Sequence, residues 1–391
     1  METCPLSLVE EILNLYSTFP LRPPARQWTI LASFFLTSST TGLHKIISLA
    51  TGTKCLPANR LPADGESLHD SHAEVLARRG AVRWFLEEIR RCQDAPSQSE
   101  WIHRCDDARH ALKPAVRMSL YISTVPCGDA SMRFLSTSQD EQMAALKALS
   151  ATRSPGPDPV VITRGRANYA LFGALRTKPG RADAPSTASM SCSDKIASYS
   201  FLGIQGALGS RFLHPLYIHS VIIGEVPAEL QSVVRDDCER AVWRRLEGIL
   251  DCGEYSLHRP AIQFTPLPFV HSRTTTPDVG GSCNDSLWWI ADSSNPAEVL
   301  INGFKRGVAP KHRHREQSRP QACRKSMLHL YHETLRVCGL PPEPDLPYQD
   351  TKQAMAEYQA AKQSLIGEKS IFSGWNRGSS IAFLRVGDSE G

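Results

Sequence analysis

The chain has 391 residues, of which 41% are hydrophobic and 21% are charged. This composition is typical of a globular protein and excludes wholesale disorder and a fibrous structure. The length allows one large domain or two ordinary ones of roughly 100–200 residues, so burying a sizeable core presents no difficulty.

The net charge of +4 only mildly favours a polyanionic partner. No apolar run approaches the about 20 residues that a membrane-spanning helix requires, so no membrane partner is expected. The first residues, METCPLSLVEEILNLY, carry acidic side chains where a secretory signal has a basic stretch. We therefore expect an intracellular protein, in the cytoplasm, the nucleus or both. Its 11 cysteines are then mostly reduced thiols, some of which could bind metal.

In the first half of the chain, apolar periodicity predicts a helix at 6–19, followed by a second apolar segment at 28–35. A longer helix carries the pattern SHAEVLARRGAVRWFLEEI, and Asp70 or Ser71 is its predicted N-cap. The strand VRMSLYIS begins at Val116 and ends at the break TVPCG, which leads into a turn and a helix.

The second half alternates in the same way. Loops rich in Pro, Gly, Ala, Ser and Thr flank an apolar segment, and they span 151–160 and 177–191. The remaining predictions are a helix from SCSDKIA, a buried strand from Pro215, a helix from Arg240, a basic loop at 309–320, and helices at 323–338 and 349–365. Strands alternating with helices, without internal repeats, predict an α/β layered domain.

One short string indicates a catalytic metal site. His72-Ala73-Glu74 is informative because two possible thiolate ligands, Cys127 in Pro126-Cys127 and Cys192, lie further along the chain. One histidine and two thiolates can hold zinc and leave a fourth position open for water, whose pKa the metal lowers to about 7. We therefore predict that His72, Cys127 and Cys192 bind the metal. Glu74 is the predicted catalytic group, because a carboxylate that does not bind the metal must carry the proton.

Geometry restricts where such a site can lie. Residues two apart on a helix point in nearly opposite directions, so His72 and Glu74 can face one target only at the first turn. The helix dipole also favours thiolates there, if Cys127 and Cys192 each begin a helix. Taken singly, HAE is more often an ordinary helix segment, and a free cysteine is more often a small core residue. The sequence after Cys127 departs from the PCxxC pattern of free-nucleoside deaminases, so the second thiolate must come from elsewhere.

Five strings in this order resemble the adenosine-deaminase domain of RNA-editing enzymes: GTKC (52–55), DSHAEVLARR (70–79), PCGD (126–129), MSCSDKIA (190–197) and GIQGAL (203–208). EYQAAK (357–362) and SGW (373–375) match the C-terminal region of that domain. The resemblance implies a single domain over residues 1–391. It also implies a cytidine-deaminase-like fold of three α/β/α layers around a mixed central sheet, with Cys192 as the second thiolate ligand.

The family that the chain resembles has two branches. One edits double-stranded RNA and carries additional RNA-binding domains, whereas the tRNA-specific enzyme is essentially the bare deaminase. Trp28-Thr29 and KPGRAD (178–183) resemble the second branch. In eukaryotes, that branch converts the adenosine 3′ of the anticodon (nucleotide 37) of alanine tRNA to inosine. The resemblance thus implies tRNA as the partner, with no protein partner. An editor of double-stranded RNA and a catalytically inactive RNA-binding subunit are the alternatives, and the intact Glu74 counts against the latter.

Some charged side chains fall on apolar faces of the predicted helices. Arg79 falls on the side of its helix that carries Leu76 and Leu86, unless it snorkels to solvent. In the C-terminal helix, two tyrosines and two lysines fall within an arc of about 120°. The family buries inositol hexakisphosphate in its core, and the resemblance implies the cage Lys54, Arg78, Arg79, Lys195, Lys325, Tyr348, Lys352, Tyr358, Lys362 and Trp375. The chain differs from the double-stranded RNA editors at four places in this region. His69, Ser198 and Ala207 stand where the editors have Asn, Arg and Ser, and Arg377-Gly378 replaces an acidic-basic pair.

RNA contacts are expected from basic side chains that meet phosphates. The resemblance places Thr53 near the active site and Lys178 near the RNA or its flanking loop. Further candidates are Arg164, Arg166 and Arg176, and the cluster Lys305, Arg306, Lys311, His312, Arg313, His314 and Arg315. For that cluster a solvated loop is an equal alternative. The target adenosine must be swung out of its stack to reach the site, which costs less in a loop.

Overall fold

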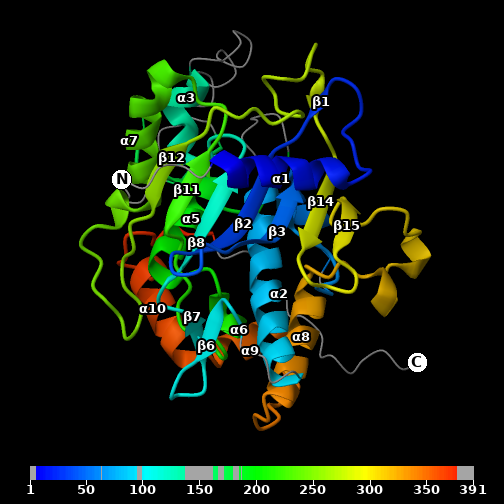
Figure 1. Cartoon of the computed structure of the whole chain (residues 1–391), viewed down its shortest axis with the longest axis vertical. Helices are drawn as coiled ribbons and strands as arrows, with labels where there is room; N and C mark the ends of the chain where they lie inside the picture. Colours follow the sequence, from blue (N-terminus) through cyan, green and yellow to red (C-terminus); the bar gives the residue numbers. More distant parts are fainter. Residues whose placement is uncertain are drawn as a thin grey trace.

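Figure 1 shows a computed structural model of the chain. The structure describes residues 6–62, 64–94, 99–136, 162–165, 171–178, 185 and 187–376. The predicted loop at 151–160, Arg166 and Arg377-Gly378 lie outside the described residues, as does most of KPGRAD.

An eight-stranded sheet forms the centre of the molecule, in the order β12-β11-β8-β2-β3-β14-β15-β16. Its strands are β2 (Leu31–Ser38), β3 (His44–Thr51), β8 (Val116–Ile122), β11 (Ser220–Ile223), β12 (Ala261–Phe264), β14 (Asp285–Ile290), β15 (Ala297–Ile301) and β16 (Phe304–Lys305). Strands β8, β11 and β12 are parallel to one another, and the other pairs are antiparallel. The predicted α/β class with a mixed central sheet is therefore confirmed.

Strand β2 shows how the sheet acquires two apolar faces. Successive side chains of a strand point to opposite sides. Phe34 and Leu36 belong to a core that includes Leu76 and Phe85 of helix α2 (Ala73–Asp94). Leu31 and Phe35 belong to a second core, formed with the buried face of helix α1 (Leu6–Thr18). Figure 1 shows α1 lying across β2 and β3, and helices cover both faces of the sheet.

The other helices are α3 (Met132–Ser136), α5 (Cys192–Leu202), α6 (Gly206–Gly209), α7 (Gln231–Val242), α8 (Arg324–Val337), α9 (Tyr348–Gln353) and α10 (Ala356–Ile366). In Figure 1, α3 and α7 lie at the upper left, near β12, whereas α6, α8, α9 and α10 lie at the bottom of the view. Short strands pair outside the main sheet: β1 (Gln27–Trp28) with β13 (Gly281–Ser282), β4 (Thr53–Cys55) with β5 (Asp70–His72), β6 (Ile102–Arg104) with β7 (His110–Leu112), and β9 (Ile162–Arg164) with β10 (Leu175–Thr177). None of the helices in the described part is long and apolar enough to span a bilayer.

Several predicted elements agree with the structure. The helix at 6–19 is α1, and the strand from Val116 is β8. Helix α8 occupies the predicted span 323–338, with Cys323 as its N-cap and Cys338 as its C-cap. The stretch at 309–320 is a loop with two short turns of 3-10 helix, and its side chains at Lys311 and Arg315 are exposed.

Other predictions were wrong. Asp70 and Ser71 do not cap α2, because they lie in β5 and pair with β4. The helix predicted from Arg240 is α7, which ends at Val242 because Trp243 leaves the helical conformation. The strand predicted from Pro215 is confined to Ser220–Ile223.

The single helix predicted at 349–365 is also wrong, since it consists of α9 and α10. The break lies at Met355, whose ψ of 75° is not helical. The side chains predicted to share one helical arc therefore belong to two helices, and only their tertiary positions decide whether they meet.

Helix α2 approaches the sheet closely at Gly80, where a Cβ would lie 2.8 Å from Ser48 Cβ and 3.0 Å from Ile290 Cγ2. We expect Gly80→Val to lower the free energy of unfolding by about 1–3 kcal/mol, because overpacking outweighs any gain in helix propensity. Thermal unfolding measures this. The matched control is Gly281→Ala, whose Cβ would meet no atom within 4 Å. A Gly80→Val protein as stable as the wild type would contradict the close approach.

Candidate active site

His72 lies where a strand becomes a helix. It ends β5, opposite Thr53 of β4, and α2 begins at the next residue. Glu74 is therefore in the first turn of α2, as the geometry of the HAE string requires. Gly52 makes this junction possible, because its φ is +151° and a Cβ there would overlap the carbonyl oxygen of Ser71. Thr53 is thus adjacent to the site, as predicted.

The two cysteines also lie at the starts of elements. Cys127 follows β8 and precedes a turn of 3-10 helix, and Cys192 is the first residue of α5. The Cys192 backbone N–H donates to Cys127 Sγ at 3.3 Å. Gly128, with a φ of +112°, permits this approach, because a Cβ there would overlap the Ser191 hydroxyl. Ser191 caps α5 by accepting a hydrogen bond from the backbone N–H of Asp194.

These segments bring the three predicted metal-binding side chains together. His72 Nδ1 lies 3.8 Å from Cys127 Sγ and 3.6 Å from Cys192 Sγ. The three donor atoms all lie within 4.8 Å of one another. One imidazole nitrogen and two sulfurs form a donor set that suits zinc.

The electrostatics of the two thiols differ. The hydrogen bond with Cys192, together with the positive charge of Lys178, holds the pKa of the Cys127 thiol well below its usual value. Burial and the adjacent Cys127 raise the pKa of Cys192. A bound cation would favour the thiolate form of both.

Glu74 is the outlier among the buried side chains of the site. It is 3% exposed, and neither carboxylate oxygen has a hydrogen-bond partner in the structure. Burial, and then the neighbouring Cys127, raise the pKa of Glu74. Buried polar atoms are nearly always paired, so an orphaned carboxylate beside the donor cluster indicates that a ligand or solvent belongs there.

A buried charge network supports the second cysteine. The Lys178 ammonium donates to Asp70 Oδ2 at 2.7 Å and to Cys192 Sγ at 3.2 Å. Lys195 also pairs with Asp70 and donates to Ser189 Oγ. Although burial raises the pKa of Asp70, the two ammonium groups hold it well below the ordinary value. The network thus places a fixed positive charge against the cysteine.

The predicted role of Lys178 in contacting RNA therefore needs correction, because its side chain is only 2% exposed. Arg176 needs the same correction. It is fully buried, and it donates to the carbonyl oxygens of Gly165 and Leu171. Neither can meet a phosphate directly in this conformation.

A second charged cluster lies between α2, α8, α9 and α10. The Arg78 guanidinium lies 4.8 Å from the centre of the Tyr199 ring, and Lys352 Nζ lies 5.3 Å from the centre of the Tyr348 ring. Burial lowers the pKa of Lys352, and the cations Arg78, Arg79 and Arg324 lower it further. Burial raises the pKa of Tyr358 to about 12, although Arg78 opposes this. Cations and tyrosines from separate helices thus converge as predicted, despite the break at Met355.

Other side chains expected in this cluster have different neighbours. Lys325 pairs with Glu66, whereas its neighbour Arg324 interacts with Tyr348 and Arg79. Trp375 stacks on Phe372, and Lys195 pairs with Asp70 as described above. Burial raises the pKa of Cys283, and the nearby Lys54 opposes this rise. Lys362 lies on α10 and is half-buried.

The predicted basic cluster at 305–315 is held against the rest of the protein. His314 and Arg319 contact the buried Glu66, and Lys305 pairs with Glu298 at 2.7 Å. Lys311 and Arg315 are exposed. For Arg164, the structure describes the backbone in β9 only.

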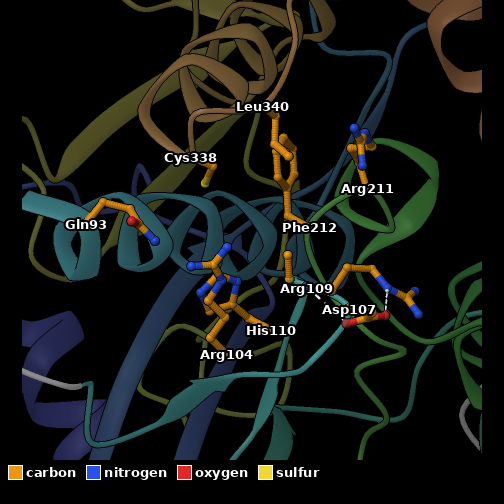
Figure 2. Close-up of a pocket in the computed structure, with 10 residues that line it drawn as sticks. Gln93, Arg104, Asp107, Arg109, His110, Arg211, Phe212, Cys338 and Leu340 are labelled. Carbon is orange, nitrogen blue, oxygen red and sulfur yellow. Dashed lines mark hydrogen bonds and ion pairs between the residues drawn. The ribbon is translucent and has the colours of Figure 1, made fainter.

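A separate pocket lies at the far end of α2 (Figure 2). Gln93, Arg109 and Phe212 are among its lining residues, and Arg109 pairs with Asp107. It lies about 28 Å from Glu74 along the helix, at about 1.5 Å per residue. The pocket is therefore distinct from the candidate site.

The His, Cys, Cys and Glu set at the starts of elements is the set that nucleobase deaminases use. The chain belongs to the adenosine-deaminase (editase) domain family, whose model matches residues 48–379. This confirms the resemblance of the sequence strings.

Relatives of both branches share sequence with the chain. It is 32% identical over 317 residues to tRNA-specific adenosine deaminase 1 of Schizosaccharomyces pombe, covering 79% of this chain and 78% of that protein. It is 32% identical over 323 residues to the protein of that name in Drosophila melanogaster, covering 78% and 75%. The double-stranded RNA-specific editase Adar of Drosophila melanogaster is 28% identical over 252 residues, covering 64% of this chain but 36% of the editase.

Asp70→Asn tests the charge network. Removing the carboxylate would leave Lys178 and Lys195 facing each other without compensation, so we expect the free energy of unfolding to fall by about 3–5 kcal/mol. Denaturant unfolding measures this. Asp236→Asn is the matched control, because its side chain is 58% exposed and lies 3.8 Å from Arg244, so about 0–1 kcal/mol is expected there. Equal losses in the two variants would contradict the network.

Proposed function

We propose that this protein is a zinc-dependent tRNA adenosine deaminase, which converts adenosine and water to inosine and ammonia. The observation that carries the proposal is the convergence of His72, Cys127 and Cys192 beside the unpaired carboxylate of Glu74. The names of the similar tRNA-specific proteins support tRNA as the substrate. We further propose the adenosine 3′ of the anticodon (nucleotide 37) of alanine tRNA as the target.

His72, Cys127 and Cys192 would hold the zinc ion, which supplies activated water at neutral pH when it is bound. Glu74 would accept a proton from the attacking water on a carboxylate oxygen and deliver it to a ring nitrogen of the adenine. The same carboxylate would then take the remaining proton of the added hydroxyl group and pass it to the amine, which leaves as ammonia while the C=O bond of inosine forms. Its burial excludes competing hydrogen bonds, so it is free to serve the substrate. The Lys178 ammonium donates to the Cys192 sulfur and so helps to position it.

An adenosine in a loop suits this buried site, because an unpaired base costs less to swing out of its stack than a base in a duplex.

We propose a single domain of the cytidine-deaminase-like three-layer type, located inside the cell. Support for the layers comes from apolar contacts on both faces of the central sheet.

We also propose that inositol hexakisphosphate is a second cofactor. Burial lowers the pKa of Lys352, and repulsion by the cations Arg324, Arg78 and Arg79 lowers it further. Clustering cations in a buried region is costly unless an anion compensates them. A polyanion that several tyrosines can also contact fits this region, where Tyr348 and Tyr358 lie.

Purified protein incubated with alanine tRNA and, separately, with a long RNA duplex tests the function by sequencing for inosine. We expect inosine in the tRNA. Glu74→Gln should bind the tRNA and retain zinc but deaminate about 10²–10⁴-fold more slowly, since it cannot carry the proton. Glu10→Gln, at an exposed position of α1, is the control. Inosine only in the duplex, or full activity of Glu74→Gln, would contradict the proposal.

Mass spectrometry of the denatured protein, purified without added ligand, tests the second cofactor. We expect inositol hexakisphosphate to be released in a ratio of about one per chain, because a buried polyanion exchanges slowly. Lys352→Met should lower both this content and the thermal midpoint, whereas Lys311→Met, in the exposed loop, should change neither. A wild-type protein that releases none would refute the cage.

A further inference from the structure

Phe172 is an aromatic side chain held at the surface. It is 44% exposed. The Arg240 guanidinium lies 4.6 Å from the centre of the ring, and the Arg133 guanidinium lies 5.7 Å from it. The ring and the two guanidinium groups together form what we call the Phe172 platform.

Buried acids fix the two arginines of the platform. Asp129 and Asp237 are fully buried. Arg133 Nε donates to Asp237 Oδ1 at 2.8 Å, and Arg240 Nε donates to Asp129 Oδ2 at 3.1 Å. Because the carboxylates hold the guanidinium groups from beneath, little side-chain entropy is lost when a ligand contacts the platform.

Asp129 also ties the platform to the candidate active site. The backbone N–H of Gly173, next to Phe172, donates to Asp129 Oδ1 at 2.8 Å. Asp129 lies two residues after Cys127 in the chain. In the other direction, the segment from Phe172 leads to Lys178, whose ammonium lies 3.2 Å from Cys192 Sγ. Both connections are short, and the backbone from Phe172 to Lys178 spans at most about 22 Å.

We propose that the Phe172 platform stacks a nucleobase that neighbours the target adenosine in the RNA loop. This proposal rests on the proposed function. When the target base leaves its stack, its neighbour loses a partner, and an aromatic face can replace it. The adjacent guanidinium groups can stack on bases or pair with phosphates. A protein partner fits less well, because such an interface requires a larger apolar patch than one ring between two cations.

Fluorescence anisotropy with labelled alanine tRNA, and with a short labelled single-stranded RNA, tests the platform. We expect Phe172→Ala to weaken binding of both about tenfold and Phe172→Trp to restore it, because stacking does not depend on base identity. Deamination of alanine tRNA at limiting protein should fall with Phe172→Ala by about the same factor as binding and should also be restored by Phe172→Trp. Leu250→Ala, which truncates a side chain that is 81% exposed, should change nothing.

Two results would overturn the platform. One is unchanged binding of Phe172→Ala. The other is weakened binding that accompanies an equal loss of thermal stability and is not restored by Trp, because the ring would then only brace its loop. Failure of the proposed function gives a different pattern, in which the wild type makes no inosine in tRNA yet binds single-stranded RNA through Phe172.

Discussion

The site depends on the close approach of three chain segments: the junction of β5 with α2, the turn after β8, and the start of α5. Side chains that lie at the ends of elements can face one point, whereas the same residues within helices would diverge. Gly52 and Gly128 permit the approach, since a Cβ at either position would overlap Ser71 or Ser191. The central sheet fixes β8, and its packing against α2 fixes the junction.

Buried charges are the second constraint. They occur both in the Asp70 network beside the cysteines and in the cationic cluster between α2, α8, α9 and α10. Asp70 compensates Lys178 and Lys195 beside the cysteines. His69 precedes it and lies between this network and the cationic cluster. Burial, and then the cations Lys195 and Arg324, lower the pKa of His69 to about 4. A neutral imidazole therefore separates the two sets of cations.

The chemical residues could be predicted because they lie in short local motifs. His72, Glu74 and Cys127 follow from residue type and spacing, and the choice of Cys192 drew on family resemblance. Burial could not be predicted in the same way. Lys178 and Arg176 were assigned to RNA because they are basic, but a single sequence does not show that Asp70 and backbone carbonyls surround them.

Two further differences have simple geometric causes. Adjacent helical residues point about 100° apart, so placing Lys325 instead of Arg324 in the cage moves the charge to another face of α8. The prediction that the C-terminal tyrosines and lysines share one helical face required a continuous helix, but the non-helical Met355 breaks that helix. Tertiary packing nevertheless brings Tyr348 and Tyr358 to the same cations. The prediction of a cluster was correct, while the local reason for it was not.

X-ray absorption at the zinc edge of the protein as purified identifies the atoms that bind the metal. We expect one zinc per chain with two sulfur neighbours and one imidazole nitrogen, and loss of one sulfur neighbour in Cys192→Ser. A protein without zinc, or a zinc surrounded only by oxygen and nitrogen, would show that His72, Cys127 and Cys192 do not form a zinc site.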